Sequence, residues 1–139
     1  MYRLSWMLIS VLFLSGFGRQ YVFQVSESMP QQPIETPWLV HLAKGDAKKM
    51  GDFFAPMIKL ELPSDKGDYS KNQAVMILSA FFNTYPALNA VIKQTGKASQ
   101  SNTFFIGEYT HSKNVFRLYV QTHEAGDRQI IHSLSITSK

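Results

Sequence analysis

The four histidines are the first side chains to consider for chemistry, because imidazole binds metals and titrates near neutral pH. They stand at positions 41, 111, 123 and 132. None of them forms the His-x-His, His-x-x-x-His or His-Glu-x-x-His spacing that sets two ligands on one face of a strand or helix. The chain also has no cysteine, which excludes disulfides, thiolate metal sites, a cysteine nucleophile and a lipidated cysteine. We therefore expect no metal and no cofactor.

One carboxylate and one imidazole are the candidates for acid–base chemistry. Glu108 shares its strand phase with Phe104 and Ile106, and His132 shares its phase with Ile130. In a dry interior, burial and mutual charge would shift the pKa values of both groups, as general acid–base catalysis requires. The alternative is that Glu108 lies at a wet opening and that His132 is a hydrogen-bonded core residue.

A wider set of aromatic and charged side chains is able to contact a ligand. The predicted ligand-binding residues are Tyr69, Phe82, Tyr85, Glu108, Arg117, Tyr119 and His132. More often such residues pack through their apolar part and keep the polar end in solvent, and this purely structural role is the alternative for each of them.

Several enzyme and nucleic-acid classes are excluded by missing motifs. Thr95-Gly96-Lys97-Ala98 resembles a phosphate loop only superficially, because position 91 is Val rather than Gly and position 98 is Ala rather than Ser or Thr. There is no Gly-x-Ser-x-Gly elbow, and no Gly-x-Gly-x-x-Gly follows the first twenty residues. The net charge of +4 comes from scattered cations without a basic stripe, so we expect no nucleic-acid binding.

The elements that position these residues begin with helices. Thr36-Pro37 predicts the start of a helix that Gly45 ends, and Asp46 begins a second short helix through Phe54. Ser70-Lys71-Asn72-Gln73 is a capping box that begins a long helix running to about residue 84. The apolar residues of that helix form a single stripe: Ala74, Leu78, Phe81, Phe82 and Tyr85.

Strands are predicted at residues 58–62, 88–97, 103–109, 115–123 and 129–137. The last four are joined by connections too short for a crossover, so they must be antiparallel neighbours. The predicted inward set is Phe104, Ile106, Phe116, Leu118, Val120, Ile130, Leu134 and Ile136. The opposite phase carries further apolar side chains: Phe105, Tyr109, Val115, Tyr119 and Ile131. Either a partner subunit packs on that outer face or these aromatic side chains stand exposed as a binding patch, and a homodimer is the commoner solution.

The first eighteen residues have the layout of a secretory signal peptide. Arg3 precedes an apolar run from Leu4 to Phe17, and the run is shorter than the roughly 20 residues that span a bilayer. We expect cleavage after Gly18; an uncleaved membrane anchor is the alternative. Residues 19–35 are predicted to be a flexible linker, and residues 36–139 a single α+β domain. The mature protein is then periplasmic or secreted, and it contacts the membrane only through the signal peptide before cleavage.

The order of elements is similar to the cone-shaped fold of nuclear transport factor two and the ketosteroid isomerases. In that fold the N-terminal helices and one long helix are wrapped by a curved, mainly antiparallel sheet. More closely, residues 40–138 resemble an uncharacterised family of exported bacterial proteins, domain of unknown function 4783. The resemblance rests on Gly45-Asp46-Ala47, Tyr69-Ser70-Lys71-x-Gln73-Ala74, Phe81-Phe82, Ile106-Gly107 and Phe116-Arg117-Leu118-Tyr119.

The sequence departs from that family at Asn114-Val115, where the family tends to place a glycine before the Phe-Arg pair. The resemblance implies the fold, export and an unassigned function, with no catalytic residue to carry over. The first functional hypothesis is a non-catalytic cell-envelope domain that binds a small apolar ligand or a protein. The alternative is a small cofactor-free isomerase or dehydratase that uses Glu108 and His132.

Overall fold

A computed structural model describes residues 33–139. The predicted signal peptide and most of the predicted linker lie outside the described residues. The chain divides into the units Met1–Gln31 and Gln32–Lys139, and everything below concerns the second. Its elements are α1 (Leu39–Lys44), α2 (Ala47–Gly51), β1 (Phe54–Glu61), β2 (Lys66–Ser70), α3 (Lys71–Thr84), β3 (Asn89–Lys97), β4 (Asn102–His111), β5 (Asn114–Ala125) and β6 (Arg128–Ser138). No helix among residues 33–139 is both long and apolar enough to cross a membrane.

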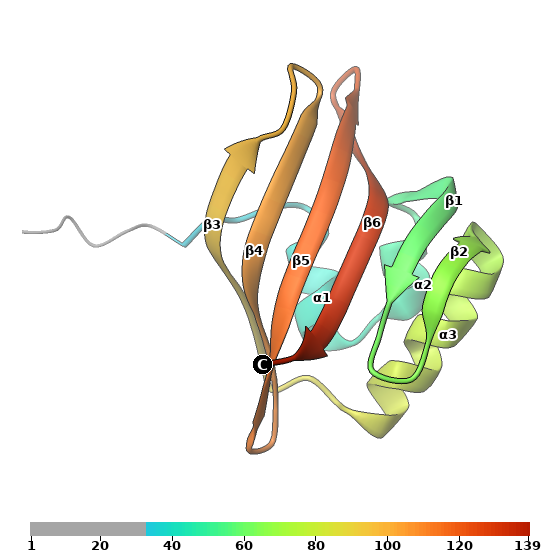
Figure 1. The fold of residues 1–139 in the computed structure, drawn as a ribbon, viewed down its shortest axis with the longest axis vertical. Helices are drawn as coiled ribbons and strands as arrows, with labels where there is room; N and C mark the ends of the chain where they lie inside the picture. Colours follow the sequence, from blue (N-terminus) through green and yellow to red (C-terminus); the bar gives the residue numbers. More distant parts are fainter. Residues whose placement is uncertain (1–32) are drawn as a thin grey trace, which may run out of the picture. The chain divides into compact units, whose positions relative to one another are not determined.

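The six strands form one curved sheet in the order β2-β1-β6-β5-β4-β3 (Figure 1). All neighbouring strands are antiparallel except β1 and β6, which are parallel. The three helices lie on one face of the sheet (Figure 1). This arrangement confirms the predicted fold class, a mainly antiparallel sheet curved around one long helix.

The ends of the helices follow from local chemistry. The predicted capping box is present, because the Ser70 hydroxyl accepts from the Gln73 amide at 3.4 Å and the Gln73 side chain accepts from the Ser70 amide at 3.3 Å. The Asp46 carboxylate caps α2 by accepting from the Lys49 amide. The second helix is shorter than predicted, because the carbonyl oxygen of Phe53 accepts from Ile131 of β6 at 2.6 Å. The backbone at residue 53 is therefore already hydrogen-bonded to β6 and does not continue the helix.

Other elements also differ from the predictions, and β1 begins at Phe54 rather than at residue 58. Helix α1 begins at Leu39 rather than at Pro37, because residues 37 and 38 form a turn. Strand β2 was not predicted, and it pairs with β1 so that Leu60 lies opposite Gly67. The chain therefore turns between Glu61 and Lys66 and leads into an edge strand.

Aromatic side chains fill the space between α3 and the sheet. Phe81 and Phe82 of α3 place their ring centroids 5.4 and 6.0 Å from the ring of Tyr109 on β4. Phe116 on β5 closes the cluster with its centroid 6.0 Å from Phe81. Trp38 meets Phe105 edge-on at 5.2 Å. Removing these large apolar surfaces from water is the main stabilising contribution to the fold.

The predicted inward phase is correct for β5 and wrong for β4. Phe105 and Tyr109 are buried against the helices, whereas Phe104 and Ile106 are half-buried and belong to the opposite face. Both phases of β4 are apolar, so alternation alone does not choose between them. Gly107 decides it, because it shares the buried phase and leaves room for the backbone of β3.

In β6 the predicted phase fails at a bulge. The register shifts so that Ser133 lies opposite Gln121 and Ile131 opposite Thr122, and His132 is the extra residue between them. Ile131 and Leu134 are both fully buried although they are three residues apart. A bulge of this kind reverses the facing of every residue before it, so Ile131 faces the core in place of Ile130.

Candidate functional site

The seven predicted ligand-binding residues lie in separate parts of the structure. Phe82 is buried in the core, and Tyr69 on β2 packs against the edge of that core. Tyr85 follows α3 and lies at one end of the sheet. Glu108, Arg117, Tyr119 and His132 belong to strands β4, β5 and β6, outside the buried phase. The surface of β3–β6 away from the helices is called the outer face below.

An apolar ridge runs along the centre of the outer face. Ile106 of β4 lies directly opposite Tyr119 of β5, and the rings of Phe104 and Tyr119 stack with centroids 6.5 Å apart and an interplanar angle of 22°. The Tyr119 hydroxyl accepts a hydrogen bond from the side-chain amide of Gln121 at 2.9 Å. Phe104 also covers Gly96, where a Cβ atom would lie 2.4 Å from its ring. We call Phe104, Ile106 and Tyr119 the outer ridge.

Glu108 ends the outer ridge in a charged cluster. Its carboxylate accepts a hydrogen bond from Lys139 and lies 3.9 Å from the Lys93 ammonium; Arg117 is its cross-strand neighbour. The hydrogen bond from Lys139 lowers the pKa of Glu108; desolvation opposes this, and the charges of Lys139 and Lys93 add to it. A carboxylate held ionised in this way is unsuited to donate a proton as a general acid.

His132 lies far from this charged cluster. It lies beside Gln121 of β5. Gln121 is four residues, or about 13 Å, along the strand from Arg117, the cross-strand neighbour of Glu108. Burial lowers the pKa of His132, and the neighbouring charge of His123 lowers it further. The expectation that Glu108 and His132 face one interior pocket therefore does not hold, because the two side chains are at different ends of the outer face.

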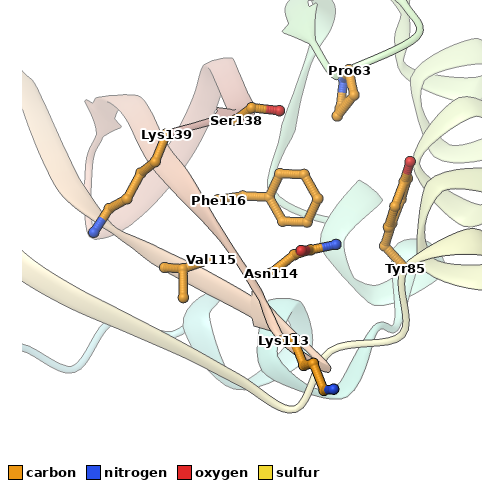
Figure 2. Close-up of a pocket in the computed structure, with 8 residues that line it drawn as sticks. All are labelled: Pro63, Tyr85, Lys113, Asn114, Val115, Phe116, Ser138 and Lys139. Carbon is orange, nitrogen blue, oxygen red and sulfur yellow. The ribbon is translucent and has the colours of Figure 1, made fainter.

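A pocket of about 370 Å³ opens at the end of the sheet where α3 finishes (Figure 2). We call it the open-end pocket. Four separate segments build it: the loop after β1, the end of α3, the β4–β5 hairpin and the end of β6. Its lining residues are Pro63, Tyr85, Lys113, Asn114, Val115, Phe116, Ser138 and Lys139.

Tyr85 is held firmly as one wall of the open-end pocket. Its ring meets Phe116 edge-on at 5.3 Å and His111 edge-on at 5.6 Å. Its carbonyl oxygen accepts from the hydroxyl of Tyr109 at 2.5 Å. Of the lining residues, sequence reasoning identified only Tyr85 as a ligand contact. The others come together through strand register, which places Phe116 opposite Ser138, and no local motif signals that pairing.

The described residues offer no metal centre. Within residues 33–139 no three His, Asp or Glu side chains are grouped closely enough to hold an ion.

Comparison with known proteins identifies the family. A family model described as "Domain of unknown function (DUF4783)" matches residues 39–137. The chain belongs to this family. No curated protein matches the chain.

Solved structures of DUF4783 proteins share the fold. One from Bacteroides ovatus matches with a TM-score of 0.69 at 17% identity, covering 78% of this chain and 97% of that one. One from Bacteroides fragilis matches with a TM-score of 0.68 at 19% identity, covering 76% and 99%. A protein named Rd1NTF2_04 with long sheet matches with a TM-score of 0.57 at 18% identity, covering 71% and 92%. These likenesses confirm the fold that the sequence predicted.

The residues that carry the DUF4783 resemblance have structural tasks in this chain. Ser70 and Gln73 cap α3, Phe81 and Phe82 fill the core, and Gly107 admits the backbone of β3. None of these tasks involves a reacting group. The fold explains these parts of the DUF4783 pattern, whereas Ile106 and Tyr119 of the same pattern belong to the outer ridge.

Proposed function

We propose that this DUF4783 protein is an exported, non-catalytic binding domain of the bacterial cell envelope that forms a homodimer through its outer face. The observation that carries the proposal is the outer ridge of Phe104, Ile106 and Tyr119, which lies on the face opposite the described helices. Apolar side chains gathered on an open sheet face favour association with a protein.

The flat area of the outer face approaches that of a standard interface. Strands β3–β6 have nine to twelve residues each, so the face measures about 30 Å by about 19 Å at ordinary strand rise and spacing. Side-chain relief enlarges this flat area of about 570 Å² toward the roughly 800 Å² per partner of a standard interface.

The shape of the outer face suits a two-fold axis. Ser133 and Ser135 of β6 lie beside Gln121 and Tyr119, so a shallow strip of small side chains runs alongside the outer ridge. In an isologous dimer the ridge of one copy can lie over the serine strip of the other, and the reverse contact follows by symmetry. This supports a second copy as the partner.

Two observations favour binding over catalysis. The acid–base candidates Glu108 and His132 are separated on the outer face, and the lowered pKa of Glu108 keeps it ionised. Aromatic side chains occupy the interior in which an isomerase would hold its substrate. Export rests on the layout of residues 1–18, and the N-terminal mass of the secreted protein tests it: a retained Met1 contradicts cleavage.

Sedimentation equilibrium of the mature protein tests the interface. We expect a dimer at about 10 µM, as for a standard interface, and a monomer for Ile106→Lys, which puts a charge in the outer ridge. Met76→Lys is the matched control, because Met76 is 72% exposed on α3, and it should stay dimeric. A wild-type protein that is monomeric at about 100 µM refutes the homodimer.

A further inference from the structure

The open-end pocket is a second surface with its own chemistry. Figure 2 shows the Phe116 ring and the Asn114 amide directed toward Tyr85, and the Ser138 hydroxyl directed toward Pro63. The pocket therefore combines two aromatic rings and a pyrrolidine ring with a phenol hydroxyl, an amide and an aliphatic hydroxyl. Its volume of about 370 Å³ is near the lower end of the range for small-molecule sites, which suits a ligand of one ring.

We propose that the open-end pocket binds a single sugar ring, such as a pyranose unit of an envelope glycan. A pyranose has apolar C–H faces and a rim of hydroxyls. Its C–H face can pack against Tyr85 and Pro63, and its hydroxyls can form hydrogen bonds with the polar groups of Asn114 and Ser138. This ligand class differs from the small apolar molecule expected from the sequence, because Asn114 and Ser138 offer hydrogen-bonding groups that an apolar ligand would not use.

The charges at the rim favour a neutral ring over a strongly anionic group. The Lys139 ammonium is already bound to Glu108, and the Lys113 side chain extends away from Tyr85 and Phe116 (Figure 2). A phosphate or sulfate is usually recognised by several cations or a bidentate arginine, and neither is found among the lining residues.

The wall on which the sugar would stack is arranged before binding. Tyr85 is held by edge contacts with Phe116 and His111 and by the bond from the Tyr109 hydroxyl to its carbonyl oxygen. Little side-chain freedom is then lost when a ligand arrives. A single ring makes few contacts, so we expect a dissociation constant on the order of 1 mM.

An NMR titration of the mature, ¹⁵N-labelled protein tests the proposal with methyl β-glucopyranoside, N-acetylglucosamine and benzoate. We expect at least one of the two sugars to shift the amide signals of Asn114, Phe116 and Ser138 in a saturable way, and benzoate to leave them unchanged. Ser138→Trp fills the pocket and should weaken sugar binding at least tenfold. Ser79→Trp is the matched control, because Ser79 is exposed on α3 outside the pocket, and it should bind as the wild type does.

Three outcomes would overturn the sugar site: no shift with either sugar at about 50 mM, well above the expected dissociation constant, shifts that respond to benzoate alone, or equal weakening in both tryptophan variants. Asn114→Ala serves if Ser138→Trp does not fold, since it removes an amide at an exposed position and should also weaken binding. The titration and the sedimentation test have separate readouts, because Asn114, Phe116 and Ser138 are not part of the outer ridge.

Discussion

Gly107 is the position at which the curvature of the sheet can be tested most sharply. A Cβ atom at Gly107 would lie 2.0 Å from the carbonyl oxygen of Val91, 3.0 Å from its carbonyl carbon and 3.1 Å from the Cα atom of Ile92. All three atoms belong to the backbone of β3, beside the irregularity between Ile92 and Gln94. No side-chain rotation can relieve such a contact, so Gly107→Ala must push β3 away from β4 by about 1 Å or more to restore normal contact distances.

The expected loss of stability follows from the β3–β4 contacts that this displacement breaks. Two β3–β4 backbone hydrogen bonds weakened at about 1 kcal/mol each, with about 1–3 kcal/mol of overpacking strain, predict that Gly107→Ala lowers the free energy of unfolding by about 3–5 kcal/mol. Urea denaturation followed by circular dichroism measures this as a lower midpoint at unchanged m-value.

A second glycine in the same pair of strands provides the control. At Gly96 the obstacle to a Cβ atom is the ring of Phe104 at 2.4 Å, an outer-face side chain that can turn aside. Gly96→Ala should therefore cost about 1 kcal/mol, typical of a mild substitution. The close backbone approach is refuted if Gly107→Ala costs less than about 1 kcal/mol, or no more than Gly96→Ala.

Three further substitutions have expected signs. Thr122 is fully buried with a hydroxyl that has no hydrogen-bond partner in the described chain, so Thr122→Val should raise the free energy of unfolding by about 1 kcal/mol, seen as a higher urea midpoint; a loss of stability would mean that the hydroxyl is bonded. Ser112 has a φ of 47° in the β4–β5 hairpin, so Ser112→Gly should raise Tm, gaining about 0.5–1 kcal/mol, and an unchanged or lower Tm contradicts the strain. The pKa of His132 is lowered in the folded protein. Its contribution to stability is therefore fully present above the pKa of the unfolded state, and it is lost as the pH falls from that value through the folded-state pKa. Unfolding at pH 7 and pH 5 should therefore show a smaller loss for His132→Gln than for the wild type; equal losses rule the residue out.

The parts of the fold that the sequence predicted are those set by short-range chemistry. The Ser70–Gln73 capping box and the apolar stripe behind it place α3 correctly, because both signals act within a few residues. The antiparallel order of β3 to β6 was predictable for a similar reason, since short connections allow no other pairing.

The facing of the strands depended on contacts between residues distant in sequence. In β4 both phases are apolar, and the choice rests on the approach of Val91 to Gly107, which no local pattern shows. In β6 the bulge at His132 changes the phase within the strand. Strand β2 has half-buried or exposed residues throughout, so it lacks the alternation by which an edge strand would be found.

The difference between the predicted and the observed facing of these strands changes the functional interpretation as well as the expected core. Because side chains alternate between faces, a wrong phase moves every residue of a strand to the other side of the sheet. In β4 the correction takes Phe105 and Tyr109 inward, where they help to fill the interior, and carries Glu108 outward with the outer ridge. In the structure, aromatic side chains pack the interior around Tyr109, and Glu108 lies on the outer face together with Phe104 and Ile106. Because aromatic side chains pack the core in this way, the two surfaces that we propose for binding are the outer face and the open-end pocket.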